Sequence, residues 1–256
     1  IRHVLETKDH VTICVESKER TWELMIYPVV GGFRMVAGKK GFFDGKPEAF
    51  SMEESEHAYI IRSKEHEMIL QKETLEISID RKAITNLKNI LFIFEKESVS
   101  ASRIQFSIHE NSAIYGFGER FDSVNQYGKT VALWQRDACE GCLASIGNQA
   151  YKNIPLVHTS DGFSFFANTS YRMRMDVGDA VQDYLSVEAL GDVFDFYIWS
   201  GTPREAMTAY GTLTGLPIFP PEWVFEPWAG GGGGRWRNGP LQDIALEQMA
   251  AMKKFH

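Results

Sequence analysis

Cysteine is scarce in this sequence, with three residues in 256, at Cys14, Cys139 and Cys142. An odd number at this density does not build a disulfide framework and is typical of a reducing compartment, so we expect a cytoplasmic protein. Cys139 and Cys142 are spaced like half of a zinc or redox motif, but a structural zinc site needs four ligands. No second cysteine pair or histidine pair stands at a suitable spacing, so the sequence predicts two loop thiols, no metal and no cofactor.

Three further features are missing, and each excludes a class of protein. Lys and Arg are outnumbered by Asp and Glu, 27 to 34, and the net charge of -7 argues against nucleic acid as a partner. No apolar run is long enough to cross a bilayer, and the first residues lack the pattern of a secretory signal, so we expect no membrane partner. The glycine run at 230–234 lacks the Gly-Lys-Ser/Thr ending of a phosphate loop and predicts a flexible loop instead.

The sequence does contain many short apolar runs separated by turn residues. With 44% hydrophobic and 12% aromatic residues, the chain can bury a large core. Several runs alternate polar and apolar side chains, as half-buried strands do, and no helical pattern interrupts them. They predict a mainly β domain, an antiparallel β-sandwich, rather than a parallel sheet. The expected strands are 11–15, 22–27, 33–36, 59–61, 68–70, 75–79, 90–94, 162–167, 171–175, 184–187 and 193–199.

Two helices are predicted after the last of these strands. Thr202-Pro-Arg-Glu205 supplies an N-cap hydroxyl, a proline at the first helical position and a glutamate for a capping box, and Gly215 ends the helix. Next, Trp223-Val-Phe-Glu-Pro-Trp228 predicts one buried strand, and a second helix starts near Pro240. Strand, loop and amphipathic helix make one β/α unit. The apolar face of this helix favours association, so a homo-oligomer is one partner to consider.

Several motifs follow one another in the second half of the chain. The motifs are Ile114-Tyr-Gly-Phe-Gly-Glu-Arg-Phe-Asp122, Leu133-Trp-Gln-Arg-Asp137, Gln149-Ala-Tyr-Lys-Asn-Ile-Pro155 and the hinge Leu213-Thr-Gly-Leu-Pro-Ile-Phe-Pro-Pro-Glu-Trp223. In this order they resemble the amino-terminal part of glycoside hydrolase family 31, whose members are retaining α-glucosidases, α-xylosidases and relatives.

The resemblance implies a fold and an activity. The fold is a galactose-mutarotase-like sandwich over residues 1–219, with a substrate loop around 128–152, followed over 220–256 by the first β/α unit of a (β/α)8 catalytic barrel. The activity is that of a retaining α-glycosidase, hydrolysing α-linked glucosides or xylosides, with an oligosaccharide or glycoside as the partner. In the family the sandwich positions the barrel and lends it a substrate-contacting loop.

The resemblance also bears on catalysis. Retaining glycosidases use two carboxyl groups about 5 to 5.5 Å apart, one as nucleophile and one as acid and base. The family places both on later strands of the barrel, which would fall after His256. We therefore assign no catalytic residue to this chain, count the rest of the barrel as a missing partner, and predict that the chain is inactive alone.

Three residues are predicted to contact substrate. The family has an Arg-Asp pair in the substrate loop that contacts sugar hydroxyls, and Arg136 and Asp137 match it. A carboxylate can accept hydrogen bonds from two adjacent hydroxyls; the alternative for Asp137 is a surface salt bridge or a turn. Trp228 follows the expected first barrel strand, where it could stack on a sugar or fill the barrel core. Glu119 and Arg120 are interpreted as an ion pair that fixes the base of the loop, with direct sugar contact as the alternative.

Other functions compete with the enzyme hypothesis. A non-catalytic carbohydrate-binding sandwich would use Trp134, Tyr151 and Trp199 as stacking platforms. A structural or oligomerisation domain is a third hypothesis. Within the family, α-galactosides and sulfoquinovosides are alternative substrates. The hinge and the start of a β/α unit favour the enzyme.

Overall fold

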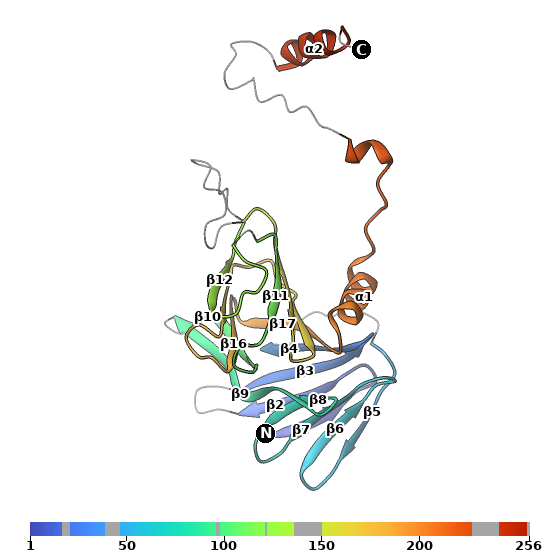
Figure 1. Ribbon diagram of the computed structural model, residues 1–256. Helices are drawn as coiled ribbons and strands as arrows, with labels where there is room; N and C mark the ends of the chain where they lie inside the picture. The colour runs from blue at the N-terminus through green and yellow to red at the C-terminus, as the bar shows by residue number, and fades with distance from the viewer. Residues whose placement is uncertain are drawn as a thin grey trace. The chain divides into compact units, whose positions relative to one another are not determined.

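The computed structural model describes residues 1–16, 21–38, 47–95, 98–120, 122–135, 150–226 and 241–254. Its contacts divide the chain into two units, Ile1–Gly215 and Leu216–His256. The first unit is a two-sheet antiparallel β-sandwich, which confirms the predicted fold class (Figure 1).

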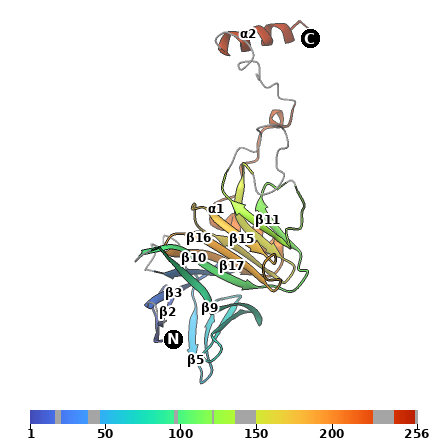
Figure 2. The same ribbon diagram turned by 90° about the vertical axis from the view of Figure 1, so that its left-hand side faces the viewer.

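The two sheets have eight and nine described strands, and all their pairings are antiparallel. The eight-stranded sheet runs in the order β1 (His3–Glu6), β2 (Val11–Glu16), β3 (Thr21–Val29), β4 (Gly32–Gly38), β17 (Val193–Ser200), β14 (Phe163–Ala167), β13 (Asn153–Thr159) and β11 (Ile114–Gly118). The nine-stranded sheet runs in the order β12 (Lys129–Leu133), β15 (Met173–Val177), β16 (Tyr184–Leu190), β10 (Ser98–Ser107), β9 (Lys82–Glu95), β8 (Glu76–Ile79), β7 (Glu67–Gln71), β6 (Ala58–Arg62) and β5 (Ser51–Glu54). The long β9 and the neighbouring β10 can be followed in Figure 2.

The core lies between the sheets and follows from the alternation of side chains along the strands. On β10, Ile104 and Phe106 are fully buried, whereas Arg103 and Gln105 point to the opposite face and are half-buried. The ring of Phe106 contacts rings from the other sheet, with centroid distances of 4.6 to 6.2 Å; these are Phe163, Phe165 and Phe196. Contacts of this kind join the two layers.

Helix α1 (Pro203–Thr214) covers part of the outer face of the eight-stranded sheet. The predicted capping box is present: the Thr202 side chain accepts from the backbone N–H of Glu205, and the Glu205 carboxylate accepts from the N–H of Thr202. Ala206 and Ala209 pack against the buried Trp199. The helix therefore belongs to the sandwich, as predicted.

A second patch on that outer face contains a buried ion pair. Arg34 on β4 donates two hydrogen bonds to Asp195 on β17, at 2.8 and 2.5 Å. Its guanidinium also lies over the rings of Tyr27 and Tyr197. Burial lowers the pKa of Arg34, but the hydrogen bonds and charge of Asp195 outweigh it and raise that pKa. The paired geometry keeps this arginine charged although only 6% of it is exposed.

The second unit contains a 3-10 helix, η1 (Glu222–Phe225), and helix α2 (Leu241–Met252). The second predicted helix is confirmed, but the strand predicted at 223–228 is wrong over its described part. The segment instead bonds locally, with the N–H of Val224 donating to Pro221 and that of Glu226 to Trp223. None of the described helices has the length and hydropathy needed to cross a membrane.

The buried ion pair generates a stability prediction. We expect Asp195→Ala to lower the free energy of unfolding by about 3 kcal/mol, because it leaves the buried Arg34 without its carboxylate. Equilibrium unfolding in urea measures this. The control is Glu53→Ala, which breaks an ion pair with Arg62 whose side chains are 59% and 43% exposed, and should cost under about 1 kcal/mol. Equal losses in both variants would contradict the prediction.

Candidate functional site

The candidate site is the base of the predicted substrate loop. Arg136 and Asp137 fall in 136–149, and Trp228 falls in 227–240, so all three lie outside the described residues. The structure does describe the two ends of the loop, at residues 133–135 and 150–153, and the elements that hold them.

The end of β11 has an unusual backbone. Gly116, Phe117 and Gly118 all have positive φ angles, of 111°, 68° and 87°. A Cβ atom at Gly116 would lie 2.2 Å from the carbonyl oxygen of Leu156, and one at Gly118 would lie 2.0 Å from that of Lys152. Both glycines are therefore required by the close approach of the chain at residues 152–156. Phe117, fully buried, keeps a conformation that costs a side-chain-bearing residue on the order of 1–3 kcal/mol.

Arg120 follows this bulge and joins both ends of the loop. Its guanidinium donates to the carbonyl of Ala132 on β12 at 3.1 Å and to the side chain of Asn153 on β13 at 2.6 Å. Burial lowers its pKa, opposed by the charge of Asp122. The predicted ion pair between Glu119 and Arg120 is wrong: Glu119 faces Lys152 at 3.7 Å in an exposed contact. The arginine instead bonds to neutral acceptors on the strands at either end of the loop.

The loop ends also contact each other. Gln135 and Ala150 form an isolated parallel β-bridge. The side chain of Asn153 donates to the carbonyl of Ala150 at 3.1 Å, and the N–H of Glu119 donates to the carbonyl of Lys152 at 2.9 Å. These bonds hold Gln135 and Ala150, the described residues on either side of 136–149, in place.

Asp122 anchors the next turn. Its carboxylate accepts from Lys129 at 2.7 Å, from Gln126 at 3.1 Å and from the N–H of Ser123 at 2.8 Å. Partial burial raises the pKa of Asp122, but these hydrogen bonds outweigh it and lower the pKa to about 2. Asp122 is thus an ionised structural residue that leads the chain into β12.

The three aromatic residues proposed as stacking platforms differ in exposure. Trp134 and Tyr151 flank the loop and are 54% and 49% exposed. Trp199 is 2% exposed and packs against Tyr210 of α1, so its assignment as a platform is wrong. On a strand whose outer face is covered by a helix, sequence alternation alone cannot distinguish a platform from core.

Two structural contacts were not predicted from the sequence, namely the hydrogen bonds of Arg120 to both loop ends and the Asp122–Lys129 pair at 2.7 Å. The available signal was the place of Arg120 and Asp122 in the motif at 114–122. In the described parts of the chain, no group of three or more His, Cys, Asp or Glu side chains could hold a metal ion.

The lowered pKa of Asp122 generates a pH prediction. Its folded pKa of about 2 lies below the reference of 3.8, so its stabilisation is fully present above about pH 4 and is lost as the pH falls toward 2. Asp122→Asn should lower the unfolding free energy at pH 7 by about 1 kcal/mol, which is less than the full pKa shift would give because solvent screens this exposed residue. It should also flatten the dependence of that free energy on pH between 4 and 2. Urea unfolding across that pH range checks this. The exposed Asp183→Asn is the control, and an unchanged pH profile in Asp122→Asn would refute the assignment.

Comparison with known proteins agrees with this geometry. Residues 13–176 match the glycosyl hydrolase 31 N-terminal galactose mutarotase-like domain. The α-xylosidase XylQ of Lactiplantibacillus pentosus is 34% identical over 131 residues, which cover 51% of this chain and 16% of that protein. Alpha-glucosidase 2 of Bacillus thermoamyloliquefaciens is 24% identical over 182 residues, covering 68% of this chain and 22% of that protein.

Solved structures show the same fold. A cycloalternan-forming enzyme from Listeria monocytogenes, in complex with a pentasaccharide substrate, superposes with a TM-score of 0.77 at 19% identity over 88% of this chain and 23% of that one. A Flavobacterium johnsoniae dextranase gives 0.70 at 20% identity over 87% and 29%. The chain thus spans less than a third of the length of these relatives. By its match over residues 13–176, the chain belongs to the family of glycosyl hydrolase 31 N-terminal galactose mutarotase-like domains.

Proposed function

We propose that this chain is the amino-terminal part of a retaining α-glycosidase that acts on α-linked glucosides or xylosides. In this proposal the sandwich positions a (β/α)8 barrel, whose first β/α unit begins in residues 220–256, and the loop around 128–152 reaches the substrate. Asp137 accepts hydrogen bonds from sugar hydroxyls, Arg136 orients it, and Trp228 contacts the sugar from the barrel side. The names of the relatives, an α-xylosidase and an α-glucosidase, support this substrate class.

The observation that carries the proposal is the construction of the loop base. A surface loop without a function does not need a half-buried arginine bonded to both of its ends, nor three consecutive residues at positive φ beside it. Strained and restrained backbone of this kind persists where the position of a loop matters. Substrate contacts require such restraint, because a displacement of about 1 Å can cost on the order of 100-fold in rate.

A carbohydrate-binding module without catalysis is the second candidate. Exposed Trp134 and Tyr151 beside the loop favour it, since both offer aromatic faces to a sugar. The burial of Trp199 removes the third stacking platform of the binding-module hypothesis. An enzyme specific for another sugar, an α-galactoside or a sulfoquinovoside, shares the loop base and differs in the barrel.

We also propose a cytoplasmic location, which the free, buried Cys14 supports.

The isolated chain should not hydrolyse p-nitrophenyl α-glucoside or α-xyloside, because the two catalytic carboxylates are proposed to lie after His256. Turnover that co-purifies with this chain would overturn that assignment. Reading the gene downstream of His256 is a complementary test: an aspartate-bearing motif at the end of a barrel strand supports the enzyme, and its absence favours the binding module.

In the longer protein, Asp137→Ala should lower kcat/KM by about ten- to a hundredfold and leave the melting temperature within a few degrees of wild type. The reason is that a hydrogen bond to a charged group contributes roughly 1.5–3 kcal/mol, and about 1.4 kcal/mol is tenfold in rate. The control is Glu110→Ala in an exposed turn of the sandwich, which should change neither quantity. A low melting temperature with normal kcat/KM in the folded fraction would make Asp137 a structural residue.

A further inference from the structure

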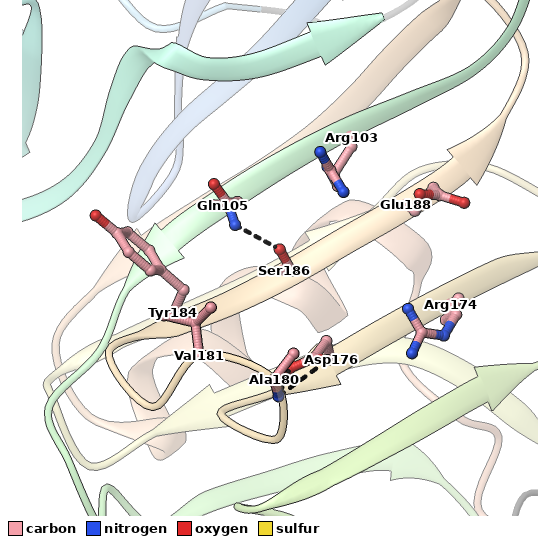
Figure 3. Close-up of a pocket in the computed structure, with 9 residues that line it drawn as sticks. All are labelled: Arg103, Gln105, Arg174, Asp176, Ala180, Val181, Tyr184, Ser186 and Glu188. Carbon is pink, nitrogen blue, oxygen red and sulfur yellow. Dashed lines mark hydrogen bonds between the residues drawn. The ribbon is translucent and has the colours of Figure 1, made fainter. Parts of the chain in front are cut away.

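A polar pocket of about 170 Å³ lies on the outer face of the nine-stranded sheet. Figure 3 shows it over β10, β16 and β15, with the turn between β15 and β16 at one end. None of its lining residues belongs to the loop at 136–149 or to the motif at 114–122. It is therefore a separate feature from the site described above.

Three charged residues form a row across the pocket. Glu188 on β16 is the register partner of both Arg103 on β10 and Arg174 on β15. Opposite charges in neighbouring register positions ordinarily pair, yet in Figure 3 no hydrogen bond joins these three side chains. The Nε atom of Arg103 is buried and has no hydrogen-bond partner in the described part of the chain. Because this Nε atom is closed to solvent, the outer nitrogens of the Arg103 guanidinium are the donors that Arg103 offers to a ligand in the pocket.

The surroundings of the row are held in place by other bonds. Asp176 is 7% exposed, and its carboxylate accepts from the N–H groups of Asp179 and Ala180, which fixes the turn. The hydroxyl of Thr130 accepts from Arg174 at 3.3 Å and donates to Asp179 at 2.9 Å. The bonds from the N–H groups of Asp179 and Ala180 occupy the carboxylate of Asp176. Glu188 is therefore the lining carboxylate whose oxygens are available to a ligand.

The chemistry of the lining identifies a class of ligand. The charges of the two arginines and two acidic residues in the lining cancel. An anionic ligand is disfavoured because it would face Glu188. A cationic ligand is disfavoured because it would face both guanidinium groups. Donors on either side of an acceptor match the alternating hydroxyls of a sugar. Val181 and the ring of half-buried Tyr184 add an apolar wall. An engineered cavity of about 150 Å³ accepts benzene, so this pocket has room for one six-membered ring.

We propose that this pocket binds one pyranose ring of a neutral carbohydrate, with Glu188 accepting hydrogen bonds from two hydroxyls and Arg103 and Arg174 donating to their neighbours. The pocket is shallow and open to water, so the affinity is low, with a Kd on the order of 1–10 mM for a monosaccharide. Such a site retains a polymeric substrate near the protein by adding a second point of attachment. The proposal does not depend on the proposed hydrolysis.

The test uses the 256-residue chain and amide chemical shifts in NMR. Methyl α-D-glucopyranoside and methyl α-D-xylopyranoside are each titrated, and we expect saturable shifts centred on residues 103–105, 174–176 and 184–188. Glu188→Gln should weaken binding about tenfold or more, because it removes a charged acceptor. Arg174→Gln, at an exposed position, is a second variant should the first fail to fold. Glu76→Gln, an exposed residue of the same sheet, should bind like wild type.

Three outcomes overturn the proposal. They are shifts that do not saturate or that centre elsewhere, unchanged affinity in both pocket variants, and saturation of the pocket by inorganic sulfate but not by either sugar. Because binding is measured on this chain and the role of Asp137 is measured by kinetics, the failure of one does not imply the failure of the other.

Discussion

The structure depends on the contact between the two sheets across an aromatic core. The ring of Phe106 from the nine-stranded sheet packs among three phenylalanine rings from the eight-stranded sheet. Each such residue buries on the order of 150–250 Å², so the layers cannot slide or separate without exposing a large apolar area. Because successive side chains on a strand point to opposite faces, this inward set also determines which residues face outward. The row of Arg103, Glu188 and Arg174 on β10, β16 and β15 faces outward because of that alternation. The ion pair on β4 and β17 faces outward for the same reason.

The loop base uses the two sheets differently. β11 and β12 are edge strands of different sheets, and the chain crosses from one to the other between them. Arg120 lies at the start of this crossing and bonds to β12 in one sheet and to β13 in the other. An arginine suits this place because it has five donors in a rigid plane and keeps its charge when it is partly buried. The loop ends are therefore positioned by the packing of the sheets, through one side chain.

The sequence was sufficient for those features that depend on local pattern. Alternation and turn residues predict eleven ranges that each overlap a described strand, whereas β1, β5, β10, β11, β12 and β13 were not predicted. Thr202 with Glu205 predicts the start of α1 from bonds made within four residues. Features that depend on distant partners were predicted less well. Arg120 bonds to residues 12 and 33 positions away, so its partner was wrongly assigned to the adjacent Glu119. The segment at 223–226 has the composition of a strand, but its backbone bonds locally as the 3-10 helix η1. The pocket combines three strands whose register no local pattern reveals.

The strain at the end of β11 has a physical consequence for the loop. Phe117 adopts a positive φ angle while its side chain is fully buried, so the core holds a backbone conformation that the residue alone would avoid. Buried aromatic packing is stronger than this cost, and the two glycines on either side let β13 approach closely. The bulge shifts the register between β11 and β13 at this point, which directs Arg120 toward both loop ends. The cost of the Phe117 backbone conformation is thus balanced by the core, and the positions of the chain ends at 133–135 and 150–153 follow from the same packing that stabilises the sandwich.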